Sequence, residues 1–292
     1  MSKSIKKLSD DLTILNTKIQ DLADNLQSLY KDYFQNFSTI VNRQLVLATY
    51  QVCTQKYPDS FLRLSYQERM KLQEKIRTFN HIFIQDFIDN LKSIECSNNQ
   101  FIQSFYRDIF DFFSSLIVME NDDETSLNQE NNQKKYSNNE DISTDIDINP
   151  QDLIKFQINL EDCIEECLMN LSHHTNKYLQ NAGILPNKIP SKILEMALQG
   201  EENTSIVSGS PNLLSLLIEK EDKSENIDIT PITAICLRLT EIEFNNSALN
   251  LTRQKITNLL QKLDTLDEEY QKITRQYAIA QAESAWRSSW VE

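Results

Sequence analysis

Residues 5–33 read IKKLSDDLTILNTKIQDLADNLQSLYKDY, and this stretch decides the fold. Its apolar residues recur at alternating intervals of three and four, with Ile or Leu at the a positions and Leu at the d positions. Such a narrow apolar seam predicts an amphipathic helix of the coiled-coil type. The seam consists of Ile5, Leu8, Leu12, Leu15, Ile19, Leu22, Leu26, Leu29 and Tyr33.

The C-terminal residues carry a second seam of similar length. Any two heptad helices can be aligned, and an antiparallel alignment of Ile5 with Ala280 places Tyr33 opposite Thr252. The e and g positions of the first seam carry little charge that would select a second copy, so we expect the two seams to pair within one chain as a stalk. A parallel homodimer through residues 5–33 is the alternative. The second seam consists of Leu249, Thr252, Ile256, Leu259, Leu263, Leu266, Tyr270, Ile273, Tyr277 and Ala280.

Glycine is scarce, and this scarcity predicts an all-α protein. Only Gly183, Gly200 and Gly209 occur in 292 residues. Hairpins and tight βα turns need glycine, whereas helices are more stable without it. A dinucleotide fingerprint and a P-loop each require glycines only a few residues apart, so both phosphate-binding motifs are excluded.

Changes in composition predict five segments. A helical head, residues 40–119 and 150–245, lies between the coiled-coil helices, residues 1–39 and 246–292. Residues 120–149 contain nine acidic residues against Lys134 and Lys135 and few large apolar ones. Such a segment cannot bury enough surface to offset its ordering entropy, which predicts a disordered acidic loop.

Helix start and stop signals divide the head. Tyr57-Pro58 ends the first helix, and Ser65 with Glu68 predicts a capping box at the start of a second, which continues to Leu91. A phenylalanine-rich third helix over residues 101–119 should be deeply buried. Pro150 predicts a helix start, and Gly183 predicts its end.

The second half of the head is harder to interpret. Residues 190–198 are expected to form a short helix, and residues 201–226 a loop that is interrupted by an apolar cluster at 213–218. Thr230-Pro231 resembles a helix N-terminus, so we predict a helix over residues 232–244. Ile235, Leu237 and Leu239 alternate with other residues and would also suit a strand.

Charge and cysteine content limit the partners and the compartment. The formal charge is −14, and the basic run 69–77 is interrupted by Glu74, which favours a solvated helix face over a nucleic-acid site. Five cysteines in apolar helical patterns are typical of a reducing compartment. No continuous apolar stretch suggests a signal peptide or a membrane span, so we expect a cytoplasmic protein without an integral membrane segment.

One group of side chains has the chemistry of a metal site. Cys163, Cys167 and His174 would share a helix face, but a structural zinc site needs four ligands, so packed core cysteines are expected and metal binding is the alternative. A hydrolase built on the same residues would lack the glycine-rich turn of an oxyanion hole. The nearby carboxylates Glu165 and Glu166 are interpreted as a solvated helix face.

The C-terminus carries Trp286, Arg287 and Trp290 beyond the second seam. The two tryptophans are four residues apart and therefore share one helix face. Exposed Trp and Arg are common anchors of protein interfaces, so these three residues are the candidate partner-binding site. The other interpretation is that they cover the end of the stalk.

Residues 45–72, LVLATYQVCTQKYPDSFLRLSYQERMKL, and residues 282–292, AESAWRSSWVE, resemble a cyanobacterial conserved protein family of unassigned function. The resemblance implies a bacterial cytoplasmic setting and assigns no catalytic residue.

These patterns together predict a non-enzymatic scaffold or adaptor. It would act through helix-to-helix contacts with protein partners and would need no cofactor. A ligand- or metal-binding helical bundle is the alternative function.

Overall fold

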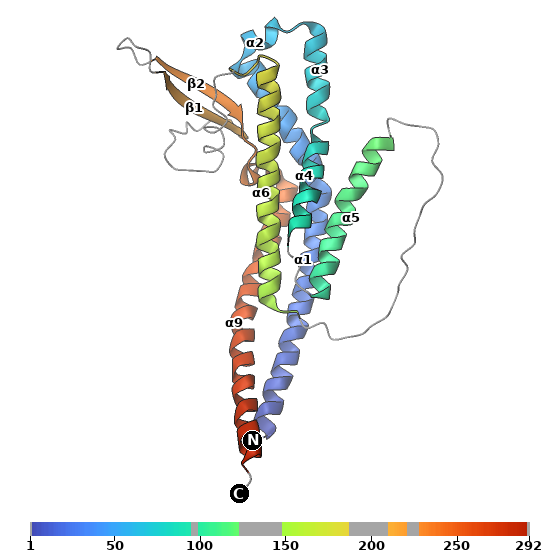
Figure 1. Cartoon of the computed structure of the whole chain (residues 1–292), viewed down its shortest axis with the longest axis vertical. Coiled ribbons are helices and arrows are strands. Elements are labelled where there is room, and N and C mark those ends of the chain that lie inside the picture. Colours follow the sequence, from blue (N-terminus) through green and yellow to red (C-terminus); the bar gives the residue numbers. More distant parts are fainter. Residues whose placement is uncertain (1, 95–98, 123–147, 187–209, 221–227, 291–292) are drawn as a thin grey trace. The chain divides into compact units, whose positions relative to one another are not determined.

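A computed structural model of the chain confirms the all-α class (Figure 1). It describes residues 2–94, 99–122, 148–186, 210–220 and 228–290. Within these residues a two-stranded antiparallel sheet accompanies the helices. The elements are α1 (Ser2–Gln51), the π-helix η1 (Val52–Lys56), α2 (Pro58–Arg63), α3 (Tyr66–Arg77), α4 (Asn80–Ser93), α5 (Gln100–Asp122), α6 (Pro150–Asn181), β1 (Leu213–Lys220), β2 (Asp228–Ile235), α8 (Leu239–Phe244) and α9 (Ser247–Ser289).

The chain divides into two compact units that do not follow the sequence order. Unit 1 contains residues 1–32, 94–160 and 252–292, and unit 2 contains residues 33–93 and 161–251. Long helices therefore contribute to both units. Residues 94–119, which the composition assigns to the head, belong to the same unit as the two chain ends.

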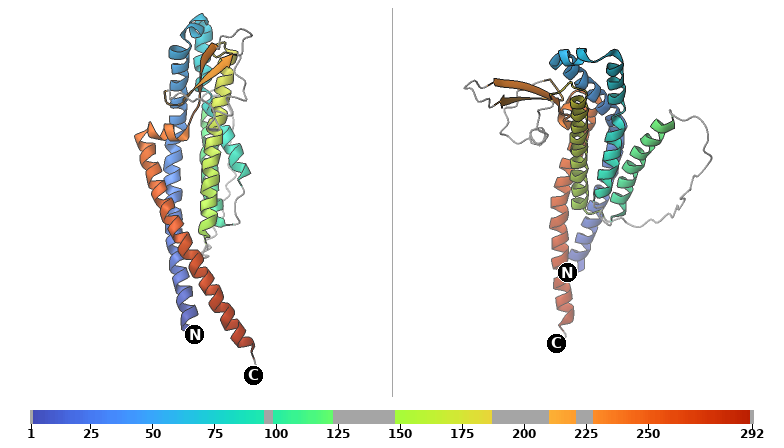
Figure 2. Two further views of the ribbon diagram at one scale, coloured as in Figure 1. Left: turned by 90° about the vertical axis from the view of Figure 1, so that its left-hand side faces the viewer. Right: turned by 45° about the horizontal axis from the view of Figure 1, so that its top comes forward.

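In unit 1 the first part of α1 and most of α9 run in opposite directions, with both chain ends on one side of the unit (Figure 2). Of the predicted seam residues of α1, Leu15, Ile19 and Leu26 are at most 2% exposed. Those nearest the N-terminus, Ile5 and Leu8, are half-buried. On α9, Ile256 and Leu263 are fully buried. The heptad pattern thus predicted both helices and their buried faces, while the supercoiled pairing and its register stay predictions.

The phenylalanine-rich helix α5 packs into unit 1. It extends three residues further than predicted, to Asp122, and Asn99 caps its start by accepting from the Phe101 N–H at 2.9 Å. Phe105 contacts the ring of Tyr30 on α1 and that of Phe156 on α6, with ring centroids 5.8 and 5.2 Å apart. Burial of its aromatic face explains the many phenylalanines of this helix.

Unit 2 has an aromatic core where α1 and α4 meet. Phe34 and Phe37 of α1 contact Phe87 and Phe83 of α4, with centroids 5.5 and 5.9 Å apart. The adjacent Tyr33 is fully buried, and its hydroxyl donates to the buried Glu243 carboxylate at 2.6 Å. A buried phenol and a buried carboxylate thus satisfy each other.

The helix predicted from Ser65 to Leu91 is two helices, which corrects that prediction. The capping box at its start is confirmed, since Ser65 and Glu68 exchange both hydrogen bonds. At the end of α3, the Thr78 N–H bonds to both Glu74 and Lys75 carbonyls and the Thr78 hydroxyl bonds to Lys75 at 2.8 Å. These local bonds tighten the last turn of α3, where the helix ends. The apolar periodicity alone did not predict this break between α3 and α4.

Residues 213–220 and 228–235 form a β-hairpin, which corrects two predictions. Leu213 pairs with Ile235 and Lys220 with Asp228, so 213–220 is not a loop. The predicted helix over residues 232–244 begins only at Leu239, and Thr230-Pro231 lies within β2 rather than at a helix start.

Side chains of α6 and of Tyr57, which lies between η1 and α2, satisfy the outer edge of β2. The Thr233 N–H donates to the Tyr57 hydroxyl at 2.9 Å. The Ile235 N–H donates to the Asn176 side-chain oxygen at 2.9 Å, and the Asn176 amide donates back to the Ile235 carbonyl at 2.7 Å. The Leu237 N–H donates to the Ser172 hydroxyl at 2.9 Å. These contacts stabilise the strand, which pairs with β1 alone among the residues that the structure describes.

The boundaries predicted for α6 are confirmed at both ends. Pro150 is its first residue, and Asn149 accepts from the Gln151 N–H at 3.2 Å. Gly183 follows the helix with φ +75°, a conformation that costs glycine little. The short helix predicted for residues 190–198 and the disordered loop predicted over most of residues 120–149 lie outside the described residues.

Candidate functional site

The last turns of α9 form the predicted partner-binding site. Every residue from 281 to 290 is exposed, although the helix continues to Ser289. Ala282 and Ala285 have the highest helix propensity, and the Ser288 and Ser289 hydroxyls bond back to the carbonyls of Ala285 and Trp286 at 2.8 and 2.9 Å. Local bonding and propensity therefore support this helix end without tertiary burial.

Trp286, Arg287 and Trp290 form what we call the tryptophan tip. Trp286 is 66% exposed and Trp290 is 71% exposed. Their ring centroids lie 6.3 Å apart at an interplanar angle of 38°, so the indoles contact each other on one side of the helix. Arg287 forms an ion pair with Glu283 at 3.9 Å. The prediction that Trp286 and Trp290 share one face is confirmed; the role of the tip in binding stays a prediction.

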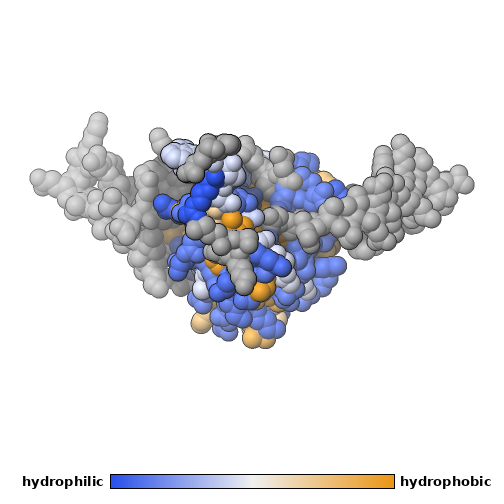
Figure 3. Space-filling view, turned by 90° about the horizontal axis from the view of Figure 1, so that it is seen from below, coloured by the Kyte–Doolittle hydropathy of each residue, from blue (hydrophilic) through white to orange (hydrophobic). Residues whose placement is uncertain are grey.

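The surface around the chain ends is hydrophilic with small, separate hydrophobic areas (Figure 3). Two adjacent indoles on such a surface present a large area that can lose water on contact with another protein. Ile279, about two turns before the tip, is 51% exposed and enlarges the apolar content of this helix end. Exposed aromatic side chains arranged in this way are common at binding surfaces.

A second candidate site, which the sequence reading missed, is a groove between α1 and α3 in unit 2. We call it the α1–α3 groove. It encloses about 340 Å³. Cys53, Leu72 and Ile76 form its floor and are at most 3% exposed, while Tyr50 on its rim is 58% exposed. The groove is lined by Val46, Thr49, Tyr50, Cys53, Thr54, Phe61, Leu72, Gln73, Ile76 and Arg77.

A π-helical turn shapes one wall of this groove. The Tyr57 N–H donates to the Val52 carbonyl at 2.9 Å, five residues back, and Pro58 then begins α2. Proline disfavours the α conformation of the residue before it, so α1 ends here in a wide turn that carries Cys53 and Thr54. Single π-turns are frequent at functional sites, and this one contributes Cys53 and Thr54 to the lining of the groove.

The segment that forms the groove contains more basic than acidic residues. Residues 43–77 contain seven Lys and Arg against three acids, in a chain whose formal charge is −14. Of the three acids, Glu68 is engaged in the capping box. Arg69 is held by the Leu64 carbonyl at 2.9 Å and lies over the Phe61 ring. Arg77 lines the groove. Arg77 therefore places a positive charge at the wall of the apolar hollow.

Tyr66 and Met70 of α3 are signals that could have revealed the site. They are large, four residues apart, and lie off the face that buries Leu72 and Ile76; Tyr66 is 74% and Met70 54% exposed. The prediction of a solvated basic face over residues 69–77 rested on the charged residues alone. It took no account of Tyr66 and Met70.

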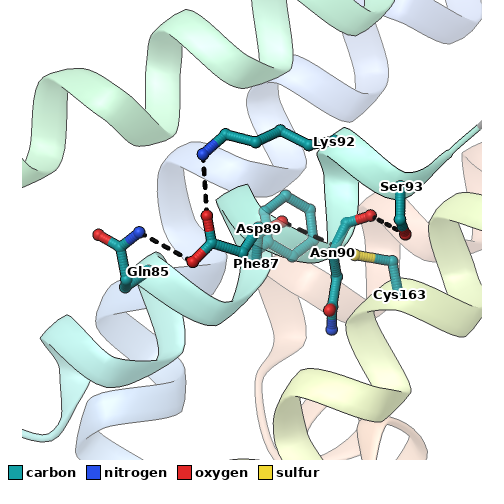
Figure 4. A network of polar contacts seen from close by, with 7 residues as sticks. All are labelled: Gln85, Phe87, Asp89, Asn90, Lys92, Ser93 and Cys163. Atoms are coloured by element: carbon teal, nitrogen blue, oxygen red, sulfur yellow. Dashed lines mark hydrogen bonds and ion pairs between the residues drawn. The ribbon is translucent and has the colours of Figure 1, made fainter.

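The cysteines of α6 are packed against α4. The Cys163 thiol donates to the Phe87 carbonyl at 3.9 Å (Figure 4). Asn90 donates to the Cys167 sulfur at 3.5 Å. A hydrogen bond with Cys163 and burial raise the pKa of Cys167. His174 is exposed, whereas both thiols are buried. Among the described residues, no group of three or more His, Cys, Asp or Glu side chains is placed to hold a metal ion.

The carboxylates near these cysteines face solvent. Asp162, Glu165 and Glu166 are exposed and border a hollow of about 470 Å³ whose other side is formed by residues 236–240. Within that segment, Arg238 pairs with Glu241 at 3.0 Å. On α4, Lys92 and Gln85 hydrogen bonds keep the pKa of the exposed Asp89 below its ordinary value (Figure 4). These are properties of solvated helix surfaces.

The chain matches no protein-family model, no curated protein and no solved structure. The part of the chain that the structure describes has no helix with the length and apolar character needed to cross a bilayer.

Proposed function

We propose that this protein is a non-enzymatic scaffold or adaptor that binds a protein partner through helix-to-helix contact at the tryptophan tip. The single observation that supports the proposal is the exposure of Trp286 and Trp290 on a helix end whose last ten described residues are all exposed. Two adjacent indoles that stay in contact with water do not contribute hydrophobic stabilisation to the chain. A partner surface that covers them would gain that stabilisation on binding.

The proposed partner is a protein, and the proposed setting is the cytoplasm. A formal charge of −14 disfavours the phosphate backbone of nucleic acids as a ligand. The described cysteines are free and buried, which fits a reducing compartment. We further propose that the heptad faces of α1 and α9 pair as an antiparallel coiled coil within one chain and so position the tip.

Intrinsic fluorescence tests the tip directly, because the chain has only two tryptophans and both belong to it. We expect the isolated protein to show the emission and acrylamide quenching of water-exposed indoles. Partner binding should shift the emission to shorter wavelength and reduce quenching. Blue-shifted, protected emission in the isolated protein would mean that the indoles already cover another part of the chain.

The double substitution Trp286→Ala/Trp290→Ala should abolish partner capture in a pull-down. Because both side chains are exposed, its free energy of unfolding should change by no more than about 0.5 kcal/mol per site. Leu251→Ala, near the start of the same helix and 55% exposed, is the matched control and should retain the partner. Equal capture by wild type and double variant would remove the tip as the binding site.

A further inference from the structure

We propose that the α1–α3 groove binds an acidic amphipathic helix of a partner protein. The groove lies in unit 2, whereas the tryptophan tip lies in unit 1. This proposal is independent of the proposed function of the tip, and either can fail alone.

The shape and floor of the groove favour an inserted apolar side chain. Its volume of about 340 Å³ is at the lower end of ligand cavities, and its floor is formed by the side chains of Cys53, Leu72 and Ile76. The two threonines of its wall are already satisfied: the Thr49 and Thr54 hydroxyls bond to carbonyls of their own helix at 2.8 and 2.7 Å. An apolar anchor would therefore displace water without leaving these hydroxyls unpaired.

Two stripes of side chains flank the floor at helical spacing. On α1, Val46, Tyr50 and Cys53 recur at intervals of four and three residues. On α3, Tyr66 and Met70 continue into the groove-lining Gln73 and Arg77 at intervals of four, three and four. A third helix with apolar residues at i, i+4 and i+7 has the same repeat and can follow both stripes.

The charge around the groove selects an acidic partner. Residues 43–77 carry a net positive charge, whereas the whole chain has a formal charge of −14. Arg77, at the wall of the groove, forms no ion pair with any residue that the structure describes. Carboxylates on the solvent-facing edges of a bound helix would meet these cations, which gives sequence selectivity and faster association.

A synthetic peptide provides the probe. It is a fluorescently labelled helix of about 18 residues, or five turns, with Leu at i, i+4 and i+7 and Glu at the flanking positions. We expect saturable binding to the full chain by fluorescence anisotropy, weakening as ionic strength rises. A scrambled peptide of equal composition and a peptide with Lys in place of Glu should bind at least about tenfold more weakly, a difference of about 1.4 kcal/mol.

Two pairs of variants locate the binding site. Val46→Asp places a charge in the groove, whereas Leu47→Asp, at a neighbouring exposed residue that does not line it, is its control. Arg77→Glu reverses the charge at the wall, and Lys71→Glu makes the same change elsewhere on α3. We expect Val46→Asp and Arg77→Glu to weaken peptide binding about fivefold to tenfold, and both controls less than about twofold. Circular dichroism melting checks that all four remain folded.

Several results would overturn the proposal. Absence of acidic-peptide binding, or equal binding to the Val46→Asp and Leu47→Asp variants, would contradict it. Anionic vesicles that bind tightly and depend on Lys71 as much as on Arg77 would indicate a membrane surface. Light scattering that shows a dimer dissociated by Val46→Asp would identify a second copy as the occupant. Peptide binding that appears only after deletion of residues 123–147 would identify the chain's own acidic segment.

Discussion

In unit 2, single side chains form hydrogen bonds that the backbone of a neighbouring strand would ordinarily form. Asn176 is 1% exposed and satisfies both the N–H and the carbonyl of Ile235, as a neighbouring strand would. Ser172 satisfies the N–H of Leu237 and, through its own hydroxyl proton, the Leu168 carbonyl. The end of β2 is thereby hydrogen-bonded to buried side chains of α6 and does not present an open strand edge.

The buried thiol of Cys53 should make stability fall at alkaline pH. Burial raises the pKa of Cys53 from 9.0 to about 12. Between these values the unfolded chain releases the thiol proton and the folded chain retains it, so the free energy of unfolding decreases as pH rises above about 9. Below pH 9 the thiol is protonated in both states and contributes no pH dependence.

Denaturant unfolding between pH 8 and pH 10.5 measures this effect. Cys53→Ser removes the titrating group and should give a flatter alkaline slope than wild type. Cys236, whose pKa is also raised by burial, remains in the variant and should leave part of the slope. Identical slopes in both proteins would contradict the assignment to Cys53.

At the scale of elements, the hairpin depends on helices that are distant in sequence. Tyr57, Ser172 and Asn176 hold β2 and the residues that follow it, and these contacts span between 59 and 176 residues of chain. The alternation of Ile235, Leu237 and Leu239 suggested a strand, but of these three residues only Ile235 lies in β2. The chain leaves the sheet after Ile235, and α8 begins at Leu239.

Replacing Asn176 by Ala should destabilise this junction. The buried N–H and carbonyl of Ile235 would both lose their partner, which costs about 2–4 kcal/mol in the free energy of unfolding. The Ile235 amide should also exchange hydrogen much faster. Asn181→Ala, at the exposed last residue of α6, is the control and should change the unfolding free energy by no more than about 0.5 kcal/mol. Unchanged exchange at Ile235 in Asn176→Ala would refute the tether.

At the scale of the whole molecule, the open question is whether the heptad faces pair within one chain or between two. Intramolecular pairing predicts a monomer of 34.0 kDa by light scattering. Leu15→Asp with Leu22→Asp places two charges at seam positions that are 2% and 7% exposed and should lower the melting temperature strongly without changing the mass.

Ile14→Asp is the matched control for this experiment, because Ile14 is 54% exposed on the same helix. It should leave both the mass and the melting temperature close to those of wild type. A wild-type dimer that separates into monomers in the Leu15→Asp/Leu22→Asp variant would refute pairing within the chain and support the homodimer.

The sequence by itself determined the helices whose signals are local. Heptad spacing defined the buried faces of α1 and α9, Ser65 and Glu68 defined the start of α3, and Gly183 defined the end of α6, because each depends on neighbours a few residues away. Trp286 and Trp290 were recognised as a pair for the same reason: four residues of helix place them on one face.

Tertiary structure alone decided the features that combine distant segments. The hairpin required Asn176 and Tyr57 to satisfy its edge, and the α1–α3 groove required a helix around residue 50 to meet one around residue 73. The periodicity of one segment does not show which distant segment it will contact. The free energy that stabilises such a contact arises only when the two surfaces lose water together.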